Sequence, residues 1–308
     1  MVHRTGPSHP TSRRDALLSL VGAGATASAA AFGQAAATPR PQPLEPPATP
    51  EHGVARVRSE FLFFKDPVAK LHAHLRIERD LGEQTDTLTW YHFMVFMVPV
   101  TNAPVPLVRY EGIEYSYLRH LGKDNFRIHA HNLSYPRDLL TGKFTDRVRN
   151  PVTGETVPIA PTVLTTDPGT VHNARGFRNT NSDGRYQDRY AMFRLEGDLI
   201  KLDSVRGAPI EKPVTHQENS CQWVPFDEFT NPAISALPCH FAGCYLYPYV
   251  PSLNMGNRPG HLMAMWDGRK INSVEELPDE YLDRARREYP ELLKPRWSEF
   301  DRPLPFAL

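Results

Sequence analysis

The stretch RIHAHNLSY, residues 127–135, determines the fold that we expect for the rest of the chain. Its length and residue types are typical of a β-strand, in which alternate side chains share one face. His129 and His131 should therefore project together from the same side of a sheet. Short strand-like runs and turn residues alternate after it, at 143–148, 156–159 and 162–165. This pattern predicts a meander of antiparallel strands.

Further strand-like segments flank this meander. The segment 107–117 should pair antiparallel with 126–135 across the turn at 122–125, which would bring Glu114 or Tyr115 opposite the two histidines. Other strands are expected at 55–64, 69–79, 87–98, 186–195, 198–205, 217–224 and 261–266, the last ending in a turn at Asp267-Gly268. A capping box at Ser273 precedes one amphipathic helix, residues 277–293.

The composition supports a β-rich fold and excludes one class of partner. The chain has 308 residues, with 35 basic and 35 acidic side chains, so it has no charge excess that would favour binding to nucleic acid. Its 30 prolines are too many for a mainly helical protein. We expect residues 53–308 to form a single domain that is mainly β, an antiparallel calycin-like barrel or sandwich with a C-terminal helix.

The N-terminus has the features of an export signal. Arg13-Arg14 precedes a segment rich in Ala, Gly and Leu, and Ala35-Ala36-Ala37 resembles a signal-peptidase site. We therefore expect a twin-arginine signal peptide at 1–37, recognised by the twin-arginine export machinery, and a Pro-rich linker at 38–52. The protein would be periplasmic or secreted, without stable membrane insertion after cleavage. The alternative, a buried or amphipathic N-terminal helix, is disfavoured because the segment has no polar face.

Three cysteines are too few to define a disulfide framework. Cys221, Cys239 and Cys244 are an odd number, so one thiol would be left over if two of them paired outside the cytoplasm. The sequence does not choose the pair. Three buried cysteines that act as small apolar side chains are the alternative.

Paired histidines on a strand suggest a metal site. Two neutral imidazoles, joined by a third histidine or a carboxylate, suit a divalent metal such as Zn, Fe, Mn or Cu. His129 and His131 are the candidate ligands. The alternative is a hydrogen-bonded pair without a metal, and the lack of an identifiable third ligand favours it.

Acid–base catalysis without a metal is the main functional hypothesis. A β domain rich in aromatic residues offers an apolar site for a small-molecule substrate, in which histidine, tyrosine or glutamate can move a proton. The candidate catalytic residues are His129, His131, Glu114, Tyr115 and His172. The candidate substrate contacts are Trp90, Tyr117, Tyr135 and Trp266. The expected reaction is of the lyase, dehydratase or isomerase type on an apolar or aromatic molecule.

The sequence also bears on three other classes of function. A Gly-x-Ser-x-Gly nucleophile elbow and the glycine-rich nucleotide loops do not occur in the sequence, which disfavours nucleophilic hydrolysis and nucleotide binding. A non-catalytic carrier of an apolar ligand would use the same aromatic site without an acid–base pair.

Several motifs along the chain resemble one family. They are YPRD at 135–138, NPVTGE at 150–155, Asp167-Pro168, NMGNRPGH at 254–261, GRK at 268–270 and ELP at 276–278. Together they resemble the bacterial and fungal domain-of-unknown-function family 1838 over nearly the whole mature chain. The resemblance implies export by the twin-arginine route but no catalytic residue. The central strand of this chain departs from the family pattern, which is closer to Arg-Glu than to His-Ala-His.

The export prediction can be tested directly. Replacing Arg13 and Arg14 together with Lys should leave the protein in the cytoplasm, because the export machinery reads the paired arginines. Fractionation of the exporting host measures this. Unchanged periplasmic accumulation of a form that begins near Thr38 would contradict it.

Overall fold

The computed structural model describes residues 59–166, 169–178, 190–207, 217–304 and 306. The expected signal peptide and linker, residues 1–52, lie outside the described residues, as do the Asp167-Pro168 motif and the polar segment 179–184. No helix in the described part of the chain is long and apolar enough to cross a membrane.

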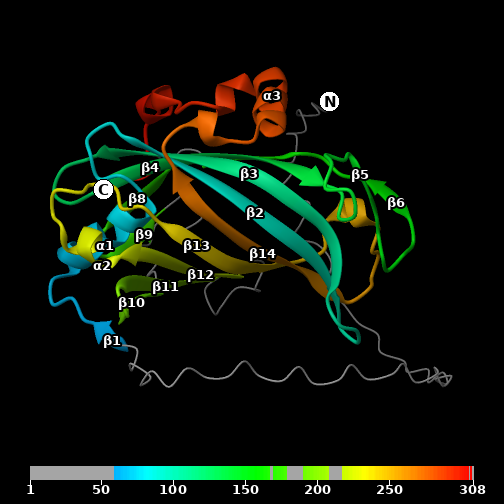
Figure 1. The fold of residues 1–308 in the computed structure, drawn as a ribbon, viewed down its shortest axis with the longest axis horizontal. Helices are drawn as coiled ribbons and strands as arrows, with labels where there is room; N and C mark the ends of the chain where they lie inside the picture. The colour runs from blue at the N-terminus through cyan, green and yellow to red at the C-terminus, as the bar shows by residue number, and fades with distance from the viewer. Residues whose placement is uncertain (1–58, 167–168, 179–189, 208–216, 305, 307–308) are drawn as a thin grey trace, which may run out of the picture. The chain divides into compact units, whose positions relative to one another are not determined.

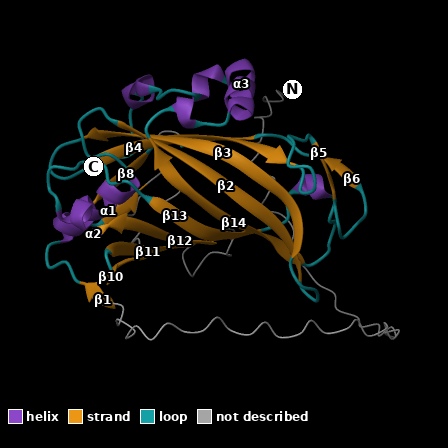
Figure 2. Cartoon of the chain, in the orientation of Figure 1, coloured by secondary structure: helices purple, strands orange, loops and turns teal. Residues whose placement is uncertain are grey.

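One large antiparallel sheet of 12 strands dominates the fold (Figures 1 and 2). Its strand order is β1-β10-β11-β12-β13-β14-β2-β3-β4-β8-β9, with β7 also paired to β4. The strands are β1 Ser59–Leu62, β2 Asp86–Pro99, β3 Val105–His120, β4 Phe126–Arg137, β7 Thr162–Thr165, β8 Thr170–Asn173, β9 Gly176–Arg178, β10 Tyr190–Glu196, β11 Leu199–Gly207, β12 Gln217–Pro225, β13 His240–Tyr247 and β14 Gly260–Ile271. A separate two-stranded sheet contains β5 Arg147–Arg149 and β6 Thr156–Pro158.

The mainly antiparallel β fold is confirmed, but the sheet does not close into a barrel. Over the described residues β1 spans 4 residues and β9 spans 3, and the strand order does not join them. The described parts of these edge strands offer few backbone groups for closure. Of the two predicted arrangements, the structure is consistent with the sandwich.

Strands β2, β3 and β4 lie side by side in the sheet, and β4 contains the predicted central strand. The meander predicted after it is only partly formed, because β7 pairs with β4 whereas β5 and β6 pair with each other in the separate sheet. β2, β3 and β4 have 14, 16 and 12 residues. The predicted pairing of β3 with β4 is confirmed, with Tyr115 opposite His131 and Glu114 opposite Asn132. Because residues opposite each other in a ladder share a face, the register assigns each side chain to one of two sides.

Two local predictions were wrong. The segment 69–79, predicted as a strand, is helix α1, Pro67–Glu78, because Asp66 accepts a hydrogen bond from the amide of Val68 and Pro67 occupies the first turn. The turn predicted at Asp267-Gly268 lies within β14. Gly268 is needed there because a Cβ would lie 2.4 Å from the carbonyl oxygen of Trp90.

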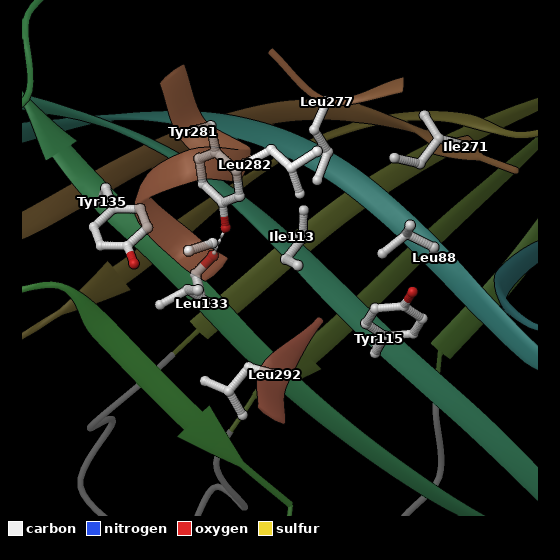
Figure 3. Packing of buried hydrophobic residues seen from close by; sticks show 11 residues of the cluster. Leu88, Ile113, Tyr115, Leu133, Tyr135, Ile271, Leu277, Tyr281, Leu282 and Leu292 are labelled. Atoms are coloured by element: carbon white, nitrogen blue, oxygen red, sulfur yellow. Dashed lines mark hydrogen bonds between the residues drawn. The ribbon is translucent and has the colours of Figure 1, made fainter. Parts of the chain in front are cut away.

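The C-terminal part of the chain covers one face of β2–β4, which we call the capped face (Figure 1). The predicted helix is confirmed in a shorter form, α3 Asp279–Glu288, because Pro290 begins the 3-10 helix η4, Pro290–Leu292. A further 3-10 helix, η5, spans Trp297–Asp301. Figure 3 shows Tyr281 of α3 donating a hydrogen bond of 2.8 Å to the carbonyl of Leu133 within the apolar cluster beneath the helix.

The opposite face of the sheet, which we call the floor face, is covered at its ends. At one end α1 and the short helix α2, Phe226–Thr230, pack with residues of β10–β12. Around β6 and the 3-10 helix η2, Pro251–Leu253, a second cluster forms with residues of β2, β3 and β14. The middle strands carry partly exposed aromatic side chains on this face.

The packing of α3 on the sheet predicts a large effect of one substitution. Ile113 is fully buried in the cluster beneath α3, so Ile113→Ala should lower the free energy of unfolding by about 2–5 kcal/mol through lost apolar contacts and the resulting cavity. Urea denaturation measures this. Leu140→Ala, at a side chain that is 96% exposed, is the control and should change stability by less than about 0.5 kcal/mol. Equal effects of both substitutions would contradict the described packing.

Candidate functional site

The sheet divides the predicted site residues between its two faces. The capped face bears His129, His131, Tyr115, Tyr117, Tyr135 and Trp90. The floor face bears Glu114 and Trp266. His129 and His131 share a face, as predicted. Glu114 does not join them, since it lies between Ile113 and Tyr115 and so points to the other side.

His129 lies in a buried network with the C-terminal segment. Its Nδ1 is 3.3 Å from Oε2 of Glu299, and the Tyr117 hydroxyl donates a 2.6 Å hydrogen bond to the same carboxylate oxygen. Arg296 pairs with the other oxygen of Glu299. The sequence did not indicate Glu299, because it lies beyond the amphipathic helix in a stretch without strand or helix periodicity.

His131 bonds the same segment through a backbone group. Its Nε2 lies 3.1 Å from the carbonyl oxygen of Leu292, which can only accept, so Nε2 carries the proton. Burial lowers the pKa of His131 to about 4, so the imidazole is neutral at pH 7. Both histidines are fully buried. Their position matches a structural role better than contact with a substrate.

The described residues contain no identifiable ligand set for a metal centre. Within the described ranges, no group of three or more His, Cys, Asp and Glu side chains could hold a metal ion. His172 lies on β8 opposite Phe126, on the face of β4 away from His129, and its ring stacks on Phe177. The three cysteines are free thiols.

The floor face carries a continuous aromatic surface, which we call the aromatic floor. Its rings are Tyr91, Phe93, Tyr110, Phe241, Tyr245 and Trp266, drawn from β2, β3, β13 and β14. The ring centroids of Phe93 and Tyr110 are 4.6 Å apart and nearly parallel, and Tyr91 stacks beside Phe93 at 6.1 Å. Trp266, the register partner of Phe93, contacts Phe241 at 5.1 Å and Tyr245 at 5.5 Å.

Glycines in the strands make room for these rings. A Cβ at Gly112 would lie 2.9 Å from the Tyr91 ring, one at Gly243 would lie 2.4 Å from the Trp266 ring, and one at Gly268 would lie 2.6 Å from the Phe241 ring. Each glycine therefore lets a neighbouring ring lie flat against the backbone. Gly112, inside the predicted strand 107–117, was the sequence signal that could have revealed the aromatic floor.

A partly exposed carboxylate lies at one edge of the aromatic floor. Glu114 accepts hydrogen bonds of 3.1 Å from Arg79 through Oε1 and 3.1 Å from Asn132 through Oε2. Its side chain is 26% exposed, whereas the histidines have no exposed surface. The carboxylate is thus oriented by two partners and still reachable.

The Tyr91 hydroxyl belongs to the same cluster of polar side chains as Glu114 and Asn132. Burial raises the pKa of Tyr91 well above its ordinary value, and the Glu114 carboxylate raises it further, while Asn132 and Ser134 oppose the rise. The phenol therefore stays protonated at neutral pH and is a hydrogen-bond donor. Carboxylate, phenol and aromatic surface together form the best-supported candidate site.

The comparisons with known proteins do not identify this chain. No protein-family model matches the sequence, and no curated protein matches it. The resemblance to domain-of-unknown-function family 1838 stays a prediction.

The buried position of His131 predicts a pH dependence of stability. The unfolded chain binds a proton at His131 below about pH 6.5, whereas the folded protein does so only below about pH 4. The free energy of unfolding should therefore fall as the pH drops through this window. His131→Gln, which cannot take up this proton, should lose less stability between pH 7 and pH 4.5 than the wild type.

Urea denaturation at the two pH values measures this difference. His240→Gln is the control, because His240 is exposed, and it should show the wild-type loss. An identical pH dependence in His131→Gln and the wild type would show that His131 is not held neutral by its surroundings.

Proposed function

We propose that the protein is an exported enzyme that binds a flat apolar or aromatic small molecule on the aromatic floor and transfers a proton through Glu114. The observation that carries the proposal is the partly exposed carboxylate held by Arg79 and Asn132 beside that floor. The reaction class is lyase, dehydratase or isomerase.

Glu114 has the chemistry of a general base in this position. Its two oxygens retain lone pairs beyond those used by Arg79 and Asn132, so one can accept a proton from a carbon of the bound molecule. The protonated Tyr91 phenol can donate a hydrogen bond to an oxygen that gains negative charge in the same step. The aromatic rings supply apolar contact area and orient a planar substrate.

This proposal changes the expected roles of the histidines. His129 and His131 have no exposed surface, so a substrate could reach them only after displacement of the C-terminal segment. Their truncation should therefore reduce stability, as expected for buried side chains that hold the C-terminal segment. Tyr115 and Tyr117 are buried on the same face, so their truncation should also reduce stability.

A non-catalytic carrier is the second candidate function. The aromatic floor is sufficient for binding, and the ion pair between Glu114 and Arg79 gives the carboxylate a structural role that needs no catalysis. The two functions differ in one property, since only the enzyme should accelerate removal of a proton from a bound aromatic molecule.

The test uses 5-nitrobenzisoxazole, a planar aromatic probe. A carboxylate removes its ring C–H proton, the C–H electrons form the nitrile, and the N–O bond breaks to release a coloured phenolate. Wild-type protein should accelerate this elimination, and Glu114→Gln should slow it by about 100-fold or more because the amide cannot act as the base.

Glu83→Gln is the matched control, because Glu83 is an exposed carboxylate and its substitution should leave the rate unchanged. Equal rates in wild type and Glu114→Gln would refute the role of Glu114. Calorimetric binding of the probe without any elimination would favour the carrier.

A further inference from the structure

A second cluster of polar side chains lies on the β12 side of the aromatic floor. Gln222 of β12 is the register partner of Phe241, and its Nε2 donates a 3.1 Å hydrogen bond to Oε1 of Glu78 on α1. Nε2 of His74 lies 3.2 Å from the same oxygen. Gln222, Glu78 and His74 are all buried, with 8%, 8% and 6% of their surface exposed.

The bond to Glu78 determines the orientation of the Gln222 amide. A carboxylate only accepts hydrogen bonds when ionised, so Nε2 must face it and a flipped amide would place two oxygens together. Oε1 is then directed away from Glu78. It is buried and has no hydrogen-bond partner in the described part of the chain. Buried acceptors without a donor are rare in native structures and require an explanation.

The position of Gln222 in the sheet explains this free acceptor. One row across the floor face runs through the register partners Gln222, Phe241, Gly268, Tyr91, Gly112 and Ser134. Gln222 and Glu114 therefore lie at opposite ends of the aromatic floor. Oε1 of Gln222 is buried on the β12 side of the floor, so a molecule that extends towards β12 would meet it once the covering side chains move aside.

Trp266 adds a donor on the same side. Its indole lies over Gly243, whose register partner on β12 is Ser220, two residues from Gln222 on the same face. The Nε1 atom of Trp266 is buried, and among the described residues it has no hydrogen-bond partner. An unused acceptor and an unused donor thus lie on the β12 side of the aromatic floor.

We infer that Gln222 selects aromatic ligands that carry a hydroxyl group. The hydroxyl donates to Oε1 of Gln222, and its oxygen has lone pairs available to Nε1 of Trp266. The inference rests on the proposed function for the location of the ligand, but not for the role of Glu114. It assigns Gln222 as a specificity-determining residue and hydroxylated planar aromatics as the ligand class.

Calorimetric titration with two naphthalenes tests the inference. 2-Naphthol donates a hydrogen bond, whereas 2-methoxynaphthalene has the same ring system and cannot donate. The wild type should bind 2-naphthol about tenfold more tightly, as expected for one additional hydrogen bond. Gln222→Met, which keeps the side-chain length but removes the amide, should abolish the preference by weakening 2-naphthol binding alone.

Trp266→Phe is the second variant, because it keeps a ring over Gly243 and leaves Gln222 in place. It should reduce the preference for 2-naphthol even if Gln222→Met does not fold, as checked by circular dichroism. A wild type without preference, or an unchanged preference in both variants, would overturn the inference.

The titrations also separate this inference from the proposed catalytic role. If Glu114→Gln keeps the preference for 2-naphthol and the wild type does not accelerate the elimination, the selection by Gln222 stands and the enzyme proposal fails. If the wild type binds neither naphthalene, the aromatic floor is not the ligand site and both fail.

Discussion

The alternation of side chains along β3 and β4 is the constraint on which this structure depends. Each strand must supply two different layers, because successive residues point to opposite faces. On the capped face Ile113, Tyr115 and Leu133 pack beneath α3, and on the floor face Gly112 and Glu114 contact the aromatic floor and its polar edge. A shift of one residue in the pairing would exchange the two layers. The register is therefore determined by both faces together.

Polar residues on the capped face bind the C-terminal segment to the sheet. Arg127, His129 and His131 alternate along β4, and each bonds a group that follows α3. Arg127 donates to the carbonyls of Phe300 at 3.0 Å and Arg302 at 2.8 Å, while the histidines meet Glu299 and the carbonyl of Leu292. Buried polar groups are stable only when paired, so strand and segment depend on each other. The docking of the C-terminal segment on β4 explains why histidines occupy positions 129 and 131.

The sequence predicted the sheet better than the site. Strand periodicity gave the pairing of β3 with β4 and the common face of His129 and His131, because both depend on local alternation. It could not give Glu299, which meets His129 only through the tertiary fold. The helix α1 was missed because the alternating Leu71–Leu75 pattern outweighed the helix start at Asp66-Pro67. Arg79 and Gln222 were missed because their importance depends on contacts between distant strands and α1.

The capped face has a direct consequence for Glu114. Its neighbours Ile113 and Tyr115 are buried beneath α3, so the backbone that carries the carboxylate is packed on the side opposite to the aromatic floor. A reactive group on a strand supported in this way keeps its orientation better than one on a loop, because its neighbours cannot move without opening the core. Arg79 and Asn132 then restrict the side chain itself. The C-terminal segment thus contributes to the proposed chemistry from the far side of the sheet, by keeping β3 rigid and without touching the substrate.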